Sequence, residues 1–313
     1  PAAQRRAMGD LMERFNAVAA ANPLSWFATR RSGTEITTAG PDNRMINFPY
    51  PKYCNAVMDV DMGAAVVVTD AQTARSWGLG PDEVAYIGGW ADAHEVWYLS
   101  QRRQVHTAPA LAECARQAVA TAGMTVDEVG AFDLYACFPS SVEVARDSLG
   151  LAAGDPRPLT LTGGLQYHGG PGSNYVTHAV ANAVAWLRHG QGDSALVHGN
   201  GYYLTKQAVG VYTRRPPSSV PEPPEGLQER IDADSTTVPL ASSFAGPGTI
   251  VAYTVTYGRD GEPGPGVMVV DAGDGHTVAR TDPATSRSLV AEDAVGRAVT
   301  VSATDDGNVA RLA

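Results

Sequence analysis

Hydrophobic and polar residues recur along the first two thirds of the chain with two different periods. Helical spacing predicts an amphipathic helix near the N-terminus, a helix that begins at Pro109 and ends at Gly123, and a helix with an apolar face from Val176 to Leu187. Short apolar runs between them predict buried strands at 63–68, 83–92, 129–138, 158–164, 194–201 and 207–213. Strands that alternate with helices in this way predict an α/β layered domain.

Two further segments have local signals of their own. Residues 23–55 show no sustained period and many turn formers, which predicts a long loop excursion that is functional or contacts a partner. Ser140 and Glu143 have the spacing of a capping box, so a helix is predicted from there to Gly150.

The pattern changes after Arg215. Residues 216–234 are rich in Pro and Glu and predict an extended, solvated linker. Beyond it, apolar and polar residues alternate around Asp-Gly and Gly-Pro turns, which predicts a small antiparallel β domain over 235–313, either an oligonucleotide/oligosaccharide-binding (OB) type barrel or a sandwich.

Composition narrows the possible functions. The formal net charge of the 313 residues is −10, and residues 217–313 hold 14 acidic and 6 basic side chains, so a nucleic-acid-binding face is not expected. No apolar run reaches the roughly 18 residues of a membrane span. Three distant cysteines indicate neither disulfides nor a zinc site and favour a reducing, cytoplasmic location.

Side chains that could take part in catalysis or binding lie where predicted strands end. Tyr135 and Cys137 lie where one strand terminates, His198 and Asn200 end another, and a glycine-rich loop at 163–175 precedes a helix. Ligands usually bind at the carboxyl ends of strands in α/β sheets. Motifs for phosphate hydrolysis, zinc proteolysis, serine hydrolysis and dinucleotide binding are absent, and the histidine spacing does not favour a metal site.

Four ordered blocks over roughly residues 40–214 resemble the thiolase superfamily, in particular sterol-carrier-type thiolases and thiolase-like proteins with an additional C-terminal domain. The blocks read GAAVVVTDAQTARSWGL, FDLYACFPSSVEVARDSLGL, LTLTGGLQYHGGPGSNYVTHA and ALVHGNGYYLTKQAVGVY. The resemblance implies a layered α/β core and carbon–carbon bond chemistry next to a CoA thioester. It divides the chain into the end of an N-terminal thiolase half (1–78), a C-terminal half (79–215), the linker (216–234) and the β domain (235–313).

The same resemblance implies site residues. The loop from Tyr135 to Phe138 stands where sterol-carrier-type members have His-Asp-Cys-Phe, so Cys137 keeps the acid/base cysteine and Tyr135 replaces an oxyanion-binding histidine. Glycine replaces the activating histidine of the family's Gly-His-Pro loop. The expected catalytic residues are Cys137, Tyr135, Tyr175 and His198, and the expected substrate-binding residues are Gly163, Gly164, His168, Gly169, Gly170, Asn174 and Asn200.

Three functions stay open on this basis. The first is an acetyl-CoA acetyltransferase-like enzyme that acts on an acyl-CoA, with coenzyme A as part of the substrate and neither a tightly bound cofactor nor a metal. The second is retro-aldol cleavage of a β-hydroxyacyl-CoA, in which Tyr135 and Tyr175 look similar to proton-carrying tyrosines of relatives. The third is a degenerate protein that binds CoA esters or scaffolds a partner.

The family's nucleophilic cysteine would lie upstream of residue 1. We therefore expect a missing N-terminal half, supplied by the same gene product or by a partner chain, and a homodimer or heteromer that forms through the thiolase core.

Overall fold

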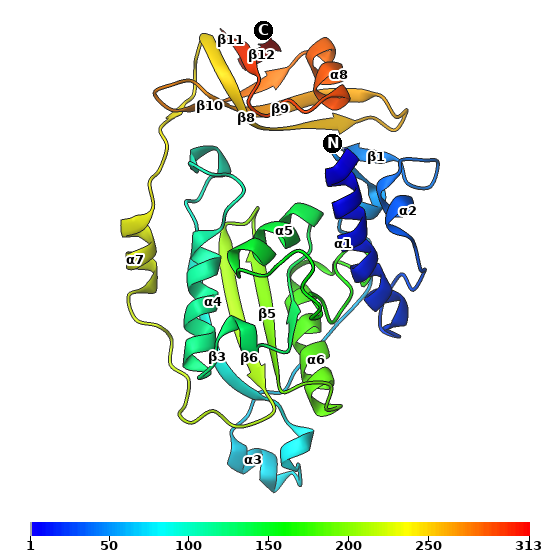
Figure 1. Cartoon of the computed structure of the whole chain (residues 1–313), viewed down its shortest axis with the longest axis vertical. Coiled ribbons are helices and arrows are strands. Elements are labelled where there is room, and N and C mark those ends of the chain that lie inside the picture. The colour runs from blue at the N-terminus through cyan, green and yellow to red at the C-terminus, as the bar shows by residue number, and fades with distance from the viewer. Residues whose placement is uncertain (1) are drawn as a thin grey trace.

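A four-stranded sheet lies at the centre of the larger part of the molecule, in a computed structural model that describes residues 2–313 (Figure 1). Its order is β3 (Tyr86–His94), β6 (Lys206–Thr213), β5 (Ser194–Gly201) and β4 (Ala131–Asp133). β6 runs antiparallel to β3 and β5, and β4 runs parallel to β5. The strands β3, β4 and β5 therefore end at the same edge of the sheet.

Helices cover both faces of this sheet. Leu196 of β5 lies in the main core with α1 (Ala2–Ala21), α4 (Pro109–Thr121) and α5 (Pro139–Ser148), while Ala195 and Val197 on the opposite face of β5 pack against α6 (Tyr175–Arg188). Successive side chains of a strand point to opposite faces, so the continuous apolar run of β5 is what a strand buried on both sides requires. The predicted helices at the N-terminus, from Pro109 and from Val176 to Leu187 are confirmed.

Shorter elements surround the core. They are α2 (Gly33–Thr37), β1 (Met45–Asn47), β2 (Tyr50–Pro51) and α3 (Ala71–Ser76), with 3₁₀ turns at Lys52–Cys54, Pro81–Glu83, Leu99–Gln101, Val126–Glu128 and Gly172–Asn174. Among the described residues no helix is both long and apolar enough to cross a membrane.

The C-terminal β domain is a closed five-stranded barrel. Its strands are β8 (Gly246–Tyr257), β9 (Pro263–Asp271), β10 (His276–Thr281), β11 (Ala298–Thr304) and β12 (Gly307–Leu312), with β7 (Leu240–Ala241) paired to β10. The order β8–β9–β10–β12–β11 closes because β11 also pairs with β8, and α8 (Pro283–Ala291) lies between β10 and β11. The prediction of a small OB-like barrel is confirmed, although two strand pairs, β10 with β12 and β10 with β7, are parallel.

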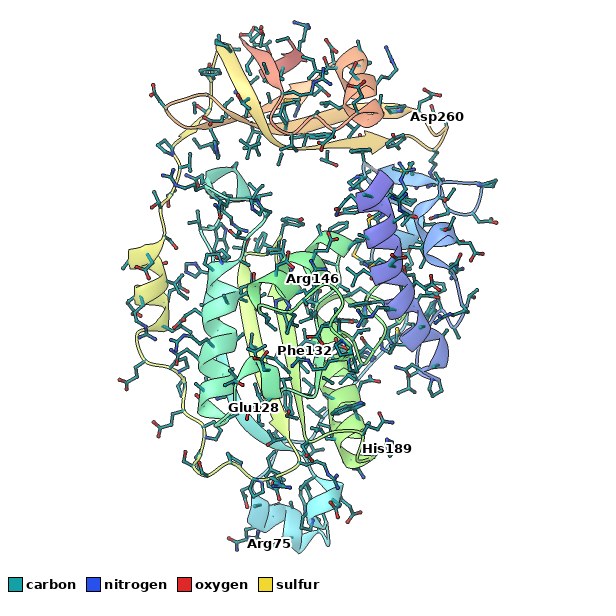
Figure 2. The ribbon with its side chains drawn as sticks, viewed as in Figure 1. Arg75, Glu128, Phe132, Arg146, His189 and Asp260 are labelled. Carbon is teal, nitrogen blue, oxygen red and sulfur yellow. The ribbon has the colours of Figure 1, made fainter. Side chains whose placement is uncertain are left out.

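The barrel is attached to the core at two places. On one side Phe48 donates a backbone hydrogen bond of 2.7 Å to Val255 of β8, and its ring stacks on Tyr253 at 5.7 Å. On the other side Ser100 accepts a hydrogen bond of 2.9 Å from the ring of His276. Figure 2 shows the resulting shape, with Asp260 in the β8–β9 turn at one end of the molecule and Arg75 of α3 at the other. The loop excursion over 23–55 therefore contacts the barrel.

One predicted strand, at 63–68, does not form. Residues 63–68 belong to no regular element and pair with no strand of the described chain, and Val67 is 79% exposed. A strand needs a partner for its backbone N–H and C=O groups, and the hydrophobic pattern of a segment does not reveal whether that partner is present.

A second predicted strand, at 158–164, is also wrong. Pro158 and Leu159 accept backbone hydrogen bonds of 2.8 and 3.0 Å from β4 and the residue after it, and the chain then leaves the sheet. The reason is the carboxylate of Asp133, which accepts the N–H groups of Leu161 and Thr162 further along the segment. The strand predicted over 129–138 shortens to the three residues of β4 for the same reason.

The predicted capping box at Ser140 and Glu143 is wrong as well. The helix begins two residues earlier than that box requires, with Phe138 as N-cap and Pro139 in the first turn, where proline's fixed φ and missing N–H cost nothing. The hydroxyl of Ser140 instead shares a hydrogen bond of 2.9 Å with Tyr203.

The linker is only partly extended. Residues 227–234 form the helix α7 (Leu227–Asp234), which lies beside α4 (Figure 1). Leu227 and Ile231 are four residues apart, so they share one face of α7, and both are buried in the main core. The prediction of an extended, solvated segment is therefore wrong for these residues.

The contact between β3 and α4 provides a test of this packing. A Cβ atom at Gly89 would overlap the backbone carbonyl oxygen of Ala118, which the helix holds in place. We expect Gly89→Ala to lower the free energy of unfolding by about 1–3 kcal/mol, the usual cost of overpacking a core. Urea unfolding of the variant and of Gly40→Ala, where the added Cβ meets open space, measures this; equal losses in both would contradict the packing.

Candidate functional site

The carboxylate of Asp133, at the end of β4, organises one side of the site. Its Oδ2 accepts hydrogen bonds from the backbone N–H groups of Leu161 at 2.7 Å and Thr162 at 2.9 Å, and from the hydroxyls of Thr160 and Thr162. Asp133 is completely buried. Burial raises the pKa of this carboxyl, and the four donors oppose that rise. The carboxylate thereby fixes the start of the glycine loop against the end of β4.

The two candidate tyrosines pack against each other beside this carboxylate. The hydroxyl of Tyr175 lies 2.7 Å from Thr162 Oγ1 and 3.5 Å from Asp133 Oδ1, and the side chain is fully buried. Burial and the neighbouring carboxylate raise the pKa of Tyr175 well above 10, although it begins α6, whose N-terminus would favour a phenolate. Tyr135 is half-buried, packs edge-on against Tyr175 at 5.4 Å, and its hydroxyl makes no hydrogen bond within residues 2–313.

Both ring nitrogens of His198 have partners. Nε2 lies 2.9 Å from Gln207 Oε1, and Nδ1 accepts a hydrogen bond of 3.4 Å from the backbone N–H of Tyr135. This pattern requires the proton on Nε2. Burial lowers the pKa of His198 to about 4, and the hydrogen bond with Gln207 partly offsets this effect. His198 is therefore neutral at pH 7 and holds β5, β6 and Tyr135, two residues after β4, together.

Cys137 is the partly exposed thiol of the site. Asn200 Nδ2 donates a weak hydrogen bond of 3.8 Å to its Sγ, and Asn200 Oδ1 is buried without a partner in the described chain. Burial raises the pKa of the thiol, while Ser141 and the backbone N–H of Phe138 at the start of α5 lower it. Cys54 and Cys114 are fully buried, and burial raises the pKa of each to about 12.

The glycine loop is covered by other parts of the chain. Gly163 has a φ of 112° and its N–H donates to Thr160 Oγ1 at 2.9 Å, while a Cβ there would overlap Ala19 of α1. The N–H of Gly164 donates to Thr162 Oγ1 at 3.3 Å, and the N–H of Gly170 donates to a backbone carbonyl at 2.8 Å. These three donors, assigned to a thioester from the sequence, already have partners within the chain.

Residues 57–64, called the strap below, cover the far end of this loop. Val57 O accepts the hydrogen bond of Gly170, and a Cβ on Gly169, whose φ is 121°, would overlap the sulfur of Met62. The amide of Asn174 pairs with both the N–H and the C=O of Ala64, at 2.9 and 3.4 Å. The structure thus places Gly169, Gly170 and Asn174 against the strap, whereas it brings Tyr135, Cys137, Tyr175, His198 and Asn200 together.

His168 also has partners on both sides. Its Nδ1 lies 3.2 Å from Ser25 Oγ and its Nε2 lies 3.4 Å from Nδ1 of His178. The ring is completely buried, and burial followed by the charge of His178 lowers the pKa of His168 to about 4. No contact in the described chain joins it to Cys137.

Sequence reasoning missed a buried polar cluster at the end of β3. Glu95 accepts hydrogen bonds from the first N–H groups of α4, at Ala110 and Leu111, through one oxygen. Arg102 donates to Thr205 Oγ1 at 2.9 Å, and its Nη1 has no partner in the described residues. The glutamate follows a strand end, which is the one signal in the sequence that could have identified it.

The turn between β5 and β6 places aromatic side chains beside the loop that carries Cys137. Tyr202 and Leu204 have positive φ values of 55° and 50°, which non-glycine residues rarely adopt and which therefore cost energy. This turn presents Tyr203 to Ser140 of α5, and Tyr50 of β2 stacks on Phe138 at 5.6 Å. Aromatic rings from two distant segments thus border the loop that carries Cys137.

With this geometry known, comparison with solved structures decides the family. The crystal structure of a monomeric SCP2-thiolase-like protein type 1 (STLP1) from Mycobacterium smegmatis matches with a TM-score of 0.88 and 36% identity, over 99% of this chain and 68% of that chain. The model of the thiolase-like protein type 1 additional C-terminal domain matches residues 226–307. The chain belongs to the thiolase-like protein type 1 family. Curated protein sequences gave no match.

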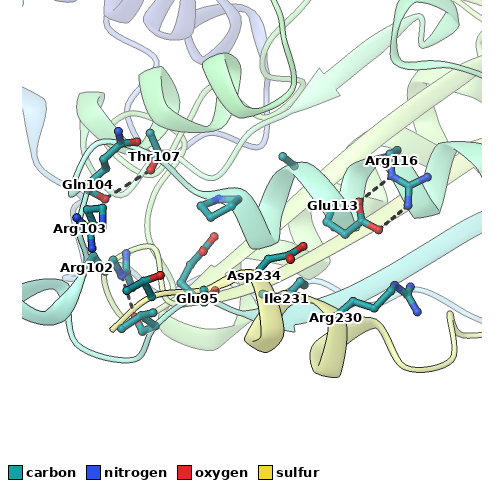
Figure 3. Close-up of a pocket in the computed structure, with 15 residues that line it drawn as sticks. Glu95, Arg102, Arg103, Gln104, Thr107, Glu113, Arg116, Arg230, Ile231 and Asp234 are labelled. Atoms are coloured by element: carbon teal, nitrogen blue, oxygen red, sulfur yellow. Dashed lines mark hydrogen bonds and ion pairs between the residues drawn. The ribbon is translucent and has the colours of Figure 1, made fainter. Parts of the chain in front are cut away.

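The thiolase-like protein also contains a cavity of about 740 Å³ between α4, α7 and the loop that follows β3 (Figure 3). Four arginines and three carboxylates line it, and Glu113 and Arg116 are paired. Glu95 and Arg102 belong both to the cavity wall and to the polar cluster. Tyr135, Cys137 and Asn200 do not line the cavity, so it is separate from the candidate site.

Residues 2–313 contain no group of three or more His, Cys, Asp or Glu side chains placed to hold an ion.

The lowered pKa of His198 gives the thiolase-like protein a testable pH dependence. An unfolded histidine titrates near 6.5, so the unfolded state binds more protons below that pH, and stability falls as the pH drops from 6.5 towards the folded value of about 4. We expect His198 to account for a loss of about 2 kcal/mol between pH 7.5 and pH 5. Urea unfolding at pH 7.5 and pH 5 measures this loss of unfolding free energy, which should be about 2 kcal/mol smaller in His198→Gln than in the wild type. The same loss in both proteins would contradict a buried, neutral His198 ring.

Proposed function

We propose that this chain binds an acyl-CoA thioester at the common edge of β4 and β5 and takes part in making or breaking the carbon–carbon bond next to the thioester. The observation that carries the proposal is Cys137, a partly exposed thiol at the start of α5 beside Asn200, whereas Cys54 and Cys114 are buried. The family membership supports a thioester as the ligand, and the residues around Cys137 support the chemistry.

Cys137 suits a proton transfer to carbon. Burial raises its pKa, so at neutral pH the thiol carries its proton. When the carbon–carbon bond breaks, its electron pair remains on the carbon next to the thioester carbonyl as an enolate. The Cys137 proton moves to that carbon, and the thiolate left behind regains a proton from water. The N–H groups at the start of α5 stabilise this thiolate.

Tyr135 suits the oxygen of that enolate. It stands where sterol-carrier-type thiolases have an oxyanion-binding histidine, its hydroxyl has no hydrogen-bond partner among the described residues, and burial raises its pKa, so it remains a neutral O–H donor. A donor aimed at a developing oxyanion is commonly the largest single contribution to such catalysis. Tyr175 and His198 hold Tyr135 in place through its ring and its backbone N–H.

An acetyl-CoA acetyltransferase reaction also needs a nucleophile that carries the acyl group. Neither Cys54 nor Cys114 suits this task, because each is fully buried with a pKa of about 12. We therefore assign the nucleophile to a polypeptide segment outside these 313 residues. Retro-aldol cleavage of a β-hydroxyacyl-CoA is the second candidate, since it breaks the bond without an acyl carrier. The β-hydroxyl loses its proton to water as its carbon becomes a carbonyl, and Cys137 and Tyr135 act at the enolate that is released.

Cys137→Ala tests the assignment. We expect turnover of a β-hydroxyacyl-CoA, or of an acyl-CoA once the segment that carries the nucleophile is supplied, to fall by about 10²–10⁴-fold, the usual worth of a positioned acid or base. Calorimetry with a thioether analogue of acetyl-CoA should show unchanged binding. Cys114→Ala is the matched control, because its thiol is buried inside α4 and its loss should leave turnover intact. Equal turnover in wild type and Cys137→Ala would contradict the catalytic role. Binding of the analogue without turnover of either substrate would leave the CoA-ester-binding alternative.

A further inference from the structure

The cavity between α4, α7 and the loop that follows β3 has a buried positive charge in its wall. Arg102 lines this cavity and is 5% exposed. Its Nε donates to the backbone carbonyl of Val96 and its Nη2 to Thr205 Oγ1, each at 2.9 Å, while Nη1 has no partner in the described residues. Arg102 takes part in no ion pair within residues 2–313. A buried charge without a partner is costly, so an anion in the cavity would stabilise it.

Glu95 does not supply that anion, although it lines the same cavity. Its Oε1 accepts the N–H groups of Ala110 and Leu111 at the start of α4, and its carboxylate forms no ion pair in the described chain. Burial lowers the pKa of Arg102, and the charge of Glu95 offsets this effect only in part. The charge of Arg102 is therefore incompletely balanced by the chain.

The loop that carries Arg102 brings further donors to the cavity. Arg103, Gln104 and Thr107 also line it, with a second guanidinium, an amide and a hydroxyl. Arg103 is exposed, and the Thr107 hydroxyl donates only at 3.5 Å, to Gln104 O. The backbone N–H groups of 103–108 donate no hydrogen bond within residues 2–313. Figure 3 shows these side chains and Arg102 gathered at one end of the cavity.

We propose that this end of the cavity binds the phosphate group of a small organic molecule. Two guanidinium groups match the charge of about −2 that a phosphate monoester carries at neutral pH. Its three terminal oxygens also accept more hydrogen bonds than the two oxygens of a carboxylate, and the planar guanidinium group suits them geometrically. The proposal goes beyond the chemistry assigned to Cys137, because neither Cys137 nor Tyr135 lines this cavity.

The rest of the cavity suits the organic part of that molecule. Its volume of about 740 Å³ lies in the range of small-molecule sites and leaves room beyond a phosphate group. Ile231 of α7, Ala112 of α4 and Val96 provide apolar surface, and Asp234 of α7 provides an acceptor for a hydroxyl or amine. The expected ligand is therefore a phosphate ester.

Calorimetry with phenyl phosphate, at constant ionic strength, tests the site on the full 313-residue chain. We expect one molecule to bind, and we expect benzoate, which presents a carboxylate on the same ring, to bind at least about tenfold more weakly because it has fewer acceptors and less charge. No binding of phenyl phosphate would overturn the proposal. Equal affinity for benzoate would overturn the assignment to phosphate.

Matched variants locate the phosphate. Arg102→Gln removes the buried charge, and Arg103→Gln removes its exposed neighbour, where loss of folding is not expected. Arg287→Gln is the control, because it removes the same charge from an exposed position of α8 in the barrel. We expect each of the first two variants to weaken phenyl phosphate binding at least about tenfold and the control to leave it unchanged. Equal affinity in Arg103→Gln and the wild type, with urea unfolding unchanged, would overturn the assignment even if Arg102→Gln does not fold.

Coenzyme A distinguishes two sources of the phosphate. If Arg103→Gln weakens binding of coenzyme A as much as it weakens binding of phenyl phosphate, the phosphate groups of the acyl-CoA occupy this cavity. If only phenyl phosphate binding is weakened, a separate phosphate ester is the ligand. Both results support a phosphate site. Phenyl phosphate carries no thioester, so a failure of acyl-CoA to bind at Cys137 would leave the calorimetric result intact.

Discussion

The buried carboxylate of Asp133 is the constraint on which the site depends. It accepts four hydrogen bonds from residues 160–162 and lies beside the hydroxyl of Tyr175, so it joins the end of β4, the start of the glycine loop and the start of α6. A hydrogen bond to a charged group contributes about 1.5–3 kcal/mol, and a buried charge that loses its partners costs more. This carboxylate ends the sheet pairing of residues 158–159 and so decides where the loop with Tyr135 and Cys137 leaves the sheet.

Burial divides the polar groups of the site into two kinds. His168, His198 and Tyr175 are completely enclosed, have partners on their polar atoms and stay neutral, so they fix positions. Tyr135 and Cys137 are only partly buried and keep their protons at neutral pH, which suits donors to an enolate rather than bases. The barrel reaches this loop through β1 and β2, because Phe48 stacks on the barrel while Tyr50 stacks on Phe138. The β domain is thus linked to the loop that carries Cys137 through two aromatic contacts.

Periodicity predicted the parts whose partners are present in the chain. The spacing of apolar residues correctly predicted the helices α1, α4 and α6, the strands β3, β5 and β6, and the barrel. Each of these elements buries a face whose apolar residues recur with the period of a helix or a strand. The strand predicted at 63–68 does not form, because the apolar pattern of a segment does not show whether a strand is present to pair with it. Tyr135 and Cys137 were chosen as candidates because they lie where a predicted strand terminates, and Asn200 because it lies near the end of another strand. Gln207 and Arg102 were missed because only tertiary folding brings them beside His198 and Thr205. The glycines of the loop correctly indicated that other atoms lie close to its backbone. Those atoms belong to α1 and to the strap at 57–64.

Affinity alkylation tests the central claim, that the thioester end of an acyl-CoA lies at Cys137. Bromoacetyl-CoA places an electrophile where the acyl carbon would be, and mass spectrometry of the digested protein identifies the modified thiol. The account predicts that bromoacetyl-CoA modifies Cys137 at least about a hundredfold faster than bromoacetamide does, because binding replaces a bimolecular encounter, and that free coenzyme A slows the reaction. Equal rates for the two reagents, or modification without preference for Cys137, would contradict the placement of the substrate.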